Sequence, residues 1–392
     1  MLKRVTTFRI RSLCNWGYRC KEIHILLFAT FSELTFAIKM PSKKSKQELE
    51  VLISRLSKTI AKAGLTLVLL VSLLLFGTFF VDVPQVRMMS APASDLQELP
   101  EEKLPIFDAV AQSGDEQLQF GYALLTQTDE LLGPLASNPS KRYTGNALQC
   151  TSCHLNDGAK DYGISLVSVD QRFPQYRGRE DKMGTLAERI NGCFTRSMNG
   201  RPLEVDQPEM LAMIAYIEWL DDYLEVDPST VKKGLKPIEL PNRAVNLEQG
   251  AEVYTTQCAV CHQQDGQGLK NPDGLTYTYP PLWGPNSYNN GAGMNRVITA
   301  AQFIKYNMPF GVSYDAPILT DEQAYDVAGY MNQQERPQRS NLELDFPNRV
   351  KKPMSTPYGP YADNFPIEQH QLGPYQPIMA YYEATFGVTK TK

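Results

Sequence analysis

Residues 150–154 read CTSCH and residues 258–262 read CAVCH, so the pattern Cys-x-x-Cys-His occurs twice. This pattern is the attachment signature of c-type haem, in which two thiols bind the porphyrin covalently and the adjacent histidine binds the iron. We therefore expect two covalently bound haem c groups, one held by each motif. The residues that would hold them are Cys150, Cys153 and His154 for the first, and Cys258, Cys261 and His262 for the second.

A zinc site and a thioredoxin-like redox pair are the alternatives for a Cys-x-x-Cys pair. A zinc site would need further cysteines or histidines in finger-like spacing, and a redox pair would need a βαβ context. The chain has seven cysteines and four histidines and offers neither arrangement. Two copies of the motif therefore favour haem over both alternatives.

Four amphipathic stretches flank the two motifs and are predicted to be helices, because apolar residues recur in them at three- and four-residue spacing. They are residues 115–133, 206–224, 246–258 and 319–334. Thr320 and Gln323 have the spacing of a capping box at the start of the last one. The segments between them are long and rich in Gly, Pro and Tyr, and a buried haem would give such loops an apolar surface to pack on.

This organisation predicts an all-α fold of two tandem cytochrome c-like domains, each built around one haem. We expect the first domain at residues 106–225 and the second at 242–340, joined by a linker at 226–241 that is rich in proline. Residues 341–392 form a tail rich in Pro and Tyr with little periodicity. Such a tail is expected to wrap the surface of a domain.

Residues 63–81 are nineteen residues without a charge, a length that just spans a hydrocarbon core of ~30 Å. Lysines and arginines precede this stretch and Asp82 follows it, which places residues 1–62 in the cytoplasm and the rest outside. We expect a single membrane-spanning helix, an anchor or uncleaved signal, then a linker at 82–105, with the protein on the periplasmic face of the inner membrane. A cleaved signal peptide is the alternative and would leave a soluble periplasmic protein. Met40 is a second candidate for the true start.

Composition excludes some classes of function. The formal net charge is −4 and no sustained basic run follows the expected membrane helix, so nucleic-acid binding has no electrostatic support. Beyond the two motif histidines the chain has only His24, ahead of that helix, and His370, in the tail. Bis-histidine ligation of both irons is therefore impossible within this chain, and a dihaem peroxidase is disfavoured.

The second iron needs an axial ligand opposite His262, and Met308 in the sequence YNMPFG is the best candidate. It lies 46 residues after His262 and just ahead of the last predicted helix. A neutral thioether raises the reduction potential and suits electron transfer. Met294 and Met331 are poorer candidates, and Met308 could instead be a packing residue. In the segment YPPLWG, residues 279–284, a backbone carbonyl is expected to accept a hydrogen bond from Nδ1 of His262.

For the first iron, Cys193 in the sequence RINGCFTRSMNGRPL is the obvious candidate. It is the one cysteine after the membrane stretch that the motifs do not use. Seven basic residues and three acidic ones lie within residues 172–201, and nearby cations lower the pKa of a thiol. An inert buried thiol beside a solvated basic face is the alternative, and Met183 and Met198 are alternative ligands.

Residues 115–335 resemble the dihaem thiosulfate dehydrogenases, which are also described as bifunctional tetrathionate reductases. The resemblance rests on both haem motifs, on ERINGCFTRSMNGRPL and on NMPFG. It implies an active-site haem held by His154 and Cys193 and an electron-transfer haem held by His262 and Met308. It also implies that two arginines, Arg179 and Arg189, help to hold the substrate. Some members have lysine just before the methionine and can exchange the two as ligands, whereas this chain has Asn307.

The resemblance implies an oxidoreductase that interconverts thiosulfate and tetrathionate at the Cys193 haem and passes electrons through the other haem to a redox partner. Joining two dianions requires cations that offset their repulsion, which the arginines around Cys193 can supply. Two other functions stay open. One is a dihaem electron carrier with no substrate of its own, and the other is a subunit of a sulfur-oxidising complex that acts on a protein-bound thiol. No motif determines the direction of the reaction.

Overall fold

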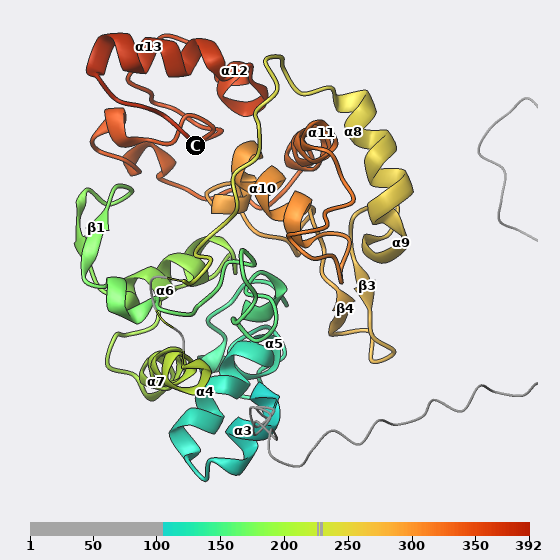
Figure 1. Cartoon of the computed structure of the whole chain (residues 1–392). Helices are drawn as coiled ribbons and strands as arrows, with labels where there is room; N and C mark the ends of the chain where they lie inside the picture. Colours follow the sequence, from blue (N-terminus) through green and yellow to red (C-terminus); the bar gives the residue numbers. More distant parts are fainter. Residues whose placement is uncertain (1–104, 226, 228–229) are drawn as a thin grey trace, which may run out of the picture. The chain divides into compact units, whose positions relative to one another are not determined.

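The computed structural model describes residues 105–225, 227 and 230–392, and most of its helices belong to two sets (Figure 1). The first set precedes residue 225 and surrounds the first haem motif. It consists of α3 (Ile106–Gln112), α4 (Glu116–Thr126), α5 (Thr128–Leu131), α6 (Leu186–Arg196) and α7 (Pro208–Leu224). The 3₁₀ turns η1 (Pro139–Lys141), η2 (Cys150–Ser152) and η3 (Asp170–Arg172) lie in the long loop between α5 and α6.

The second set of helices surrounds the second haem motif. It consists of α8 (Leu247–Val253), which continues as the π-helical turn η4 (Tyr254–Cys258), then α9 (Ala259–His262), the 3₁₀ turn η5 (Gly293–Asn295), α10 (Val297–Asn307) and α11 (Asp321–Asn332). The carboxyl-terminal segment, residues 341–392, adds η6 (Leu342–Leu344), η7 (Arg349–Lys351), α12 (Ile367–Leu372) and α13 (Gln376–Phe386). The tail therefore contains two helices that its sequence pattern did not reveal.

Capping residues fix where the helices of both sets begin. Asp115 accepts hydrogen bonds from two backbone N–H groups at the start of α4, and Asn246 does the same for α8. Thr320 and Gln323 form the predicted capping box of α11. Thr185 and Glu188 form a second capping box at the start of α6, the helix that carries Cys193.

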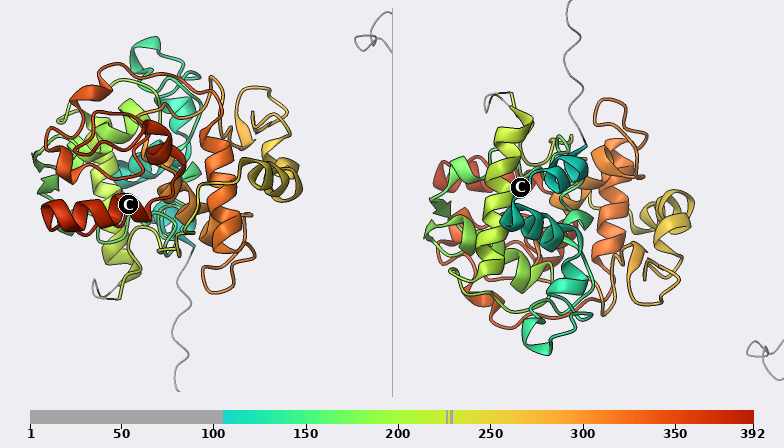
Figure 2. Two further views of the ribbon diagram at one scale, coloured as in Figure 1. Left: turned by 90° about the horizontal axis from the view of Figure 1, so that it is seen from above. Right: turned by 90° about the horizontal axis from the view of Figure 1, so that it is seen from below.

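A glycine allows the same close helix contact in both sets. The helix α4 packs on α7, and α8 packs on α11 (Figures 1 and 2). A Cβ atom on Gly121 would lie 2.1 Å from the carbonyl oxygen of Ala212, and one on Gly250 would lie 2.2 Å from that of Asp326. Only glycine permits the two backbones to approach so closely. The repeated contact indicates that the two sets share one packing scheme.

Two small antiparallel sheets are an exception to the predicted all-α fold. The strands β1 (Gln175–Arg177) and β2 (Lys182–Gly184) pair with each other, as do β3 (Leu269–Lys270) and β4 (Tyr277–Tyr279). Each pair closes a long loop, and the hydrogen bonds between its strands satisfy backbone groups that no helix serves. The fold is thus rich in helix rather than purely helical.

Each set has its own hydrophobic core, and the carboxyl-terminal segment contributes to the second. In the first core, Leu124, Met210 and Leu220 are fully buried. In the second core, Ile298 of α10 shares a cluster with Tyr375 of the tail. Met354, Ile378 and Tyr382 of the tail belong to the same cluster. The tail is therefore packed into the molecule and does not simply lie on its surface.

Hydrogen bonds between side chains and backbone carbonyls join the two sets directly. Asn146 donates to Ser287 O at 3.1 Å, and Asn307, which is fully buried, donates to Tyr162 O at 3.0 Å. The backbone N–H of Asn289 also donates to the carbonyl of Arg196 at 3.1 Å.

The expected membrane helix at residues 63–81 lies outside the described residues. Among residues 105–225, 227 and 230–392, no helix is long and apolar enough to cross a membrane.

Candidate functional site

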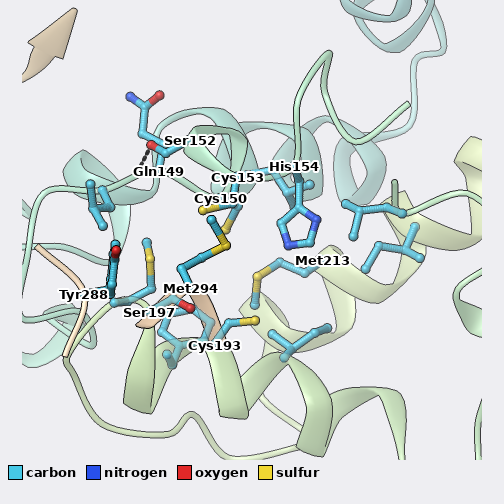
Figure 3. A pocket seen from close by; sticks show the side chains of 17 residues that line it. Gln149, Cys150, Ser152, Cys153, His154, Cys193, Ser197, Met213, Tyr288 and Met294 are labelled. Carbon is cyan, nitrogen blue, oxygen red and sulfur yellow. Dashed lines mark hydrogen bonds between the residues drawn. The ribbon is translucent and has the colours of Figure 1, made fainter. Parts of the chain in front are cut away.

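The first haem motif lines a pocket with about 760 Å³ of empty space (Figure 3). Cys150 and Cys153 come from the turn at η2, His154 follows them, and Cys193 enters from α6. Most of the remaining lining is apolar. It consists of Leu125, Leu148, Leu166, Ile190, Phe194, Met198, Met213, Ile217, Tyr288 and Met294, with Gln149, Ser152 and Ser197 as polar members.

The donors and the lining of this pocket fit a c-type haem. Burial raises the pKa of the Cys150 thiol to about 11 and that of Cys153 to about 12, as expected of an apolar environment. The Nδ1 atom of His154 donates to the carbonyl oxygen of Ile164 at 2.6 Å. This bond fixes the ring and leaves Nε2 as the atom that can bind iron.

The thiol of Cys193 is made acidic by its surroundings. Burial by itself would raise its pKa, but the charge of Arg189 and the neighbouring His154 outweigh burial and lower the pKa to about 6. The Nη1 atom of Arg189 donates to the sulfur at 3.1 Å, and the sulfur's charge in turn raises the pKa of Arg189. These surroundings favour the thiolate form of Cys193, the form that acts as nucleophile and as soft ligand.

The sulfur atoms near this site are not all those that the sequence indicated. Met198, an alternative ligand, lines the pocket, whereas Met183 lies on β2 with 59 % of its surface exposed. Met213 and Met294 also line the pocket. Met213 lies on α7, which the sequence indicated only as an amphipathic helix. Met294 was considered above as a ligand of the second iron, but it lines the pocket of the first motif.

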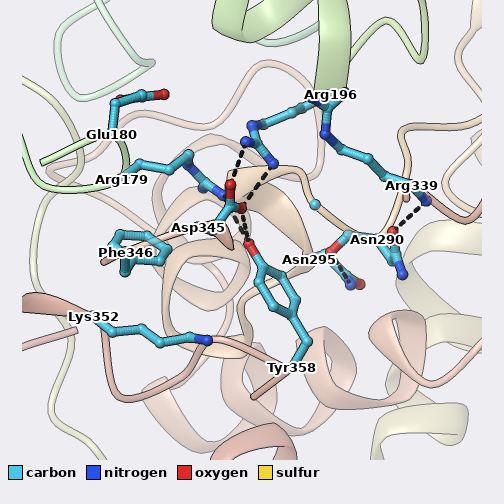
Figure 4. A network of polar contacts seen from close by, with 12 residues as sticks. Arg179, Glu180, Arg196, Asn290, Asn295, Arg339, Asp345, Phe346, Lys352 and Tyr358 are labelled. Carbon is cyan, nitrogen blue, oxygen red and sulfur yellow. Dashed lines mark hydrogen bonds and ion pairs between the residues drawn. The ribbon is translucent and has the colours of Figure 1, made fainter. Parts of the chain in front are cut away.

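Arg179 lies on the loop before α6 and is held by the carboxyl-terminal segment (Figure 4). Its Nη1 atom donates to Asp345 Oδ2 at 2.7 Å and to the Tyr358 hydroxyl at 2.8 Å. Arg196 donates to both oxygens of the same carboxylate, at 2.7 and 2.9 Å. The backbone N–H of Phe346 donates to the carbonyl of Arg179 at 2.8 Å. Of the two arginines predicted to hold substrate, Arg189 thus contacts the sulfur and Arg179 contacts the tail.

The second haem motif consists of the last residue of η4, Cys258, and the whole of α9. The Nδ1 atom of His262 donates to the carbonyl oxygen of Pro280 at 2.8 Å, which confirms the contact expected for the segment YPPLWG. Cys258 and Met308 both pack against the second core, and Met308 directly follows α10. Met331 is buried on α11 within that core. The histidine and the two thiols are the residues of this motif that attach a c-type haem, and Met308 as ligand stays a prediction.

Comparisons with known proteins agree with this organisation. A family model described as SoxA/TsdA, cytochrome c domain, matches residues 140–221, and a cytochrome c model matches residues 247–335. The first match contains the motif at residues 150–154, and the second contains the motif at residues 258–262. The protein therefore carries two cytochrome c domains and two covalently bound haem c groups.

Several relatives are named thiosulfate dehydrogenase. The one from Stutzerimonas stutzeri is 38% identical over 243 residues, which cover 62% of this chain and 74% of the relative. The one from Allochromatium vinosum is 41% identical over 199 residues, covering 50% and 72%. A solved structure, the thiosulfate dehydrogenase TsdBA from Marichromatium purpuratum, is similar with a TM-score of 0.54 and 34% identity, and the match covers 64% of this chain and 52% of that one.

Proposed function

The chain belongs to the thiosulfate dehydrogenase family, and from this membership we propose that it oxidises two thiosulfate ions to tetrathionate at the pocket that Cys193 lines. The observation that supports this most is the contact between Arg189 and the Cys193 sulfur at 3.1 Å. An electron carrier with no substrate has no need of a thiolate held by a guanidinium.

We assign His154 and Cys193 as the residues that hold the first haem, and His262 and Met308 as those that hold the second. When bound, the two haem groups would supply the redox chemistry that takes up the two electrons released by thiosulfate. The carbonyls of Ile164 and Pro280 orient the two histidine rings.

The thiolate of Cys193 is the proposed site of covalent chemistry. Its sulfur forms a bond with the sulfane sulfur of one thiosulfate, and two electrons leave, which gives a cysteine-bound thiosulfonate. The sulfane sulfur of a second thiosulfate then attacks the sulfane sulfur of this adduct, the atom that is bonded to Cys193. Tetrathionate departs, and the bond to Cys193 breaks so that the thiolate is regenerated. In total, two thiosulfate ions give one tetrathionate ion and two electrons.

The arginines around Cys193 counter the repulsion between the reacting anions. Two dianions and a thiolate would repel one another strongly where little water screens them. Arg189 at the sulfur offsets this charge before and after the bond forms. The reduction of tetrathionate uses the same steps in reverse, so we propose that the site can catalyse both directions.

We further propose that the enzyme acts on the periplasmic face of the inner membrane, held by residues 63–81, and passes its electrons to a redox partner such as another cytochrome. Membrane fractionation of cells that express the full chain tests the anchor. Recovery of all the haem protein in the soluble fraction would contradict the anchor and leave the catalytic proposal intact.

The catalytic proposal is tested with the purified holoprotein, thiosulfate, and ferricyanide as electron acceptor. We expect the wild type to reduce ferricyanide and to form tetrathionate. We expect Cys193→Ala to keep both haem groups, by absorbance of the denatured protein, but to lose turnover. Met183→Ala, a change at an exposed sulfur in the same region, is the control and should stay active. Turnover that persists in Cys193→Ala would refute the covalent route, and an inactive wild type would favour the electron carrier.

A further inference from the structure

Arg296 comes from the second set of helices but lies close to the active site of the first. It immediately precedes α10, and two residues before it Met294 lines the pocket that contains Cys193 (Figure 3). The charges of Arg179, Arg189 and Arg196 all reach its guanidinium. Four guanidinium groups from both sets therefore gather at one place.

Arg296 differs from the other three because it has no anionic partner in the part of the chain that the structure describes. Arg179 and Arg196 share the carboxylate of Asp345, and Arg189 donates to Cys193. The Nε atom of Arg296 donates to the carbonyl of Gly293 at 3.3 Å, and among the described residues no acceptor faces its two Nη atoms.

The charges around Arg296 do not balance among the described residues. Arg179, Arg189, Arg196 and Lys392 all act on Arg296 with like charge, and the carboxylate of Asp345 is already paired with Arg179 and Arg196. The carboxylate of Glu180, which acts on Arg189, is paired with Arg177 at 2.9 Å. Burial, and then the neighbouring arginines, lower the pKa of Arg296 to about 10.

A desolvated cation without a partner is costly, because burial weakens its hydration and nothing replaces it. An anion that enters this space therefore meets the Arg296 guanidinium, which has no competing anionic partner among the described residues. A guanidinium fork suits the oxygen atoms of a sulfonate, to which it can donate two parallel hydrogen bonds. The excess of positive charge around Arg296 suits an anion.

We propose that Arg296 binds the sulfonate group of a thiosulfate ion that reacts at Cys193, so that the substrate site is built from both cytochrome c domains. This inference rests on the proposed thiosulfate oxidation and assigns a residue to it that the sequence did not indicate. It also gives the second domain a part in substrate binding besides electron transfer.

Steady-state kinetics of the holoprotein with thiosulfate and ferricyanide test this assignment. Charge-assisted hydrogen bonds contribute about 10- to 100-fold to binding, so Arg296→Gln should raise the KM for thiosulfate by about that factor and change kcat much less. Arg296→Lys keeps the charge but not the fork and should recover part of the loss. Arg339→Gln is the matched control, because the side chain of Arg339 donates only to the backbone carbonyl of Thr195, at 2.8 Å, among the described residues. Its KM should stay at the wild-type value.

A second measurement separates binding from turnover. Tetrathionate should raise the thermal unfolding midpoint of the oxidised holoprotein, where no electrons are available for its reduction, and Arg296→Gln should reduce that shift. An unchanged KM together with an unchanged shift in Arg296→Gln would overturn the assignment. If the wild type itself neither oxidises thiosulfate nor responds to tetrathionate, the proposed function is wrong, and the assignment of Arg296 is wrong with it.

Discussion

The carboxylate of Asp345 accepts a hydrogen bond from Arg196 on each of its oxygens, at 2.7 and 2.9 Å, across 149 positions of sequence. The same carboxylate binds Arg179 and the hydroxyl of Tyr358. Asp345 and Arg196 expose only 9 % and 11 % of their side chains. One buried anion from the carboxyl-terminal segment thus holds two arginines of the active-site region in place.

Replacing Asp345 with alanine should destabilise the fold strongly. The change leaves two buried guanidinium groups without their anion, and such a loss costs about 3 kcal/mol or more. Denaturant unfolding of the holoprotein measures the difference. Tyr358→Phe is the graded control, because it removes a hydroxyl that donates to the carboxylate and accepts from Arg179 but leaves both ion pairs, and it should cost only about 1–2 kcal/mol. Equal stabilities of Asp345→Ala and wild type would show that the arginines need no partner.

The contribution of Asp345 should depend on pH. Burial by itself would raise its pKa, but Arg179, Tyr358 and Arg196 outweigh burial and hold the pKa below the usual range. Because the folded value is below the unfolded one, the carboxylate stabilises the protein fully above about pH 4. This stability is lost as pH falls through the folded value. Unfolding of wild type and Asp345→Asn at a series of pH values should show the two converging in acid, and a gap that stays constant there would contradict the assignment.

The matched glycines of the two helix pairs should tolerate no side chain. A Cβ atom on Gly121 or Gly250 would meet a backbone carbonyl oxygen at 2.1 or 2.2 Å, so the helices must move apart. Such overpacking costs about 1–3 kcal/mol. We expect Gly121→Ala and Gly250→Ala each to lower the free energy of unfolding by about this amount. At Gly178 a Cβ atom would meet nothing closer than 3.8 Å, and Gly178→Ala is the control. A variant as stable as that control would mean that its helix pair has room to adjust.

Local patterns were predictable from the sequence, and distant pairings were not. The haem motifs and the capping box of Thr320 each occupy a few consecutive residues, so their chemistry can be recognised from the amino-acid sequence. The pairing of Asp345 with Arg196 leaves no such trace, because an acidic residue in an irregular tail can pair with any exposed base. Met294 is in the second half of the sequence but lines the first pocket, since the two sets of helices pack together.

The ligand of the second haem should stay the same when the iron changes its oxidation state. The amide of Asn307 is fully buried and donates to the carbonyls of Tyr162 and Phe303 at 3.0 and 3.2 Å, so it is held away from the ligand position assigned to Met308. We expect absorption and paramagnetic-resonance spectra to show one methionine-ligated species before reduction and after reoxidation. Asn307→Lys places an amine beside Met308 and should produce a second species, because an unprotonated amine is a good ligand for ferric iron. Asn307→Ala removes the same hydrogen bonds without adding a ligand, and it should keep the single species. Two species in the wild type would contradict this prediction and point to a ligand other than Met308.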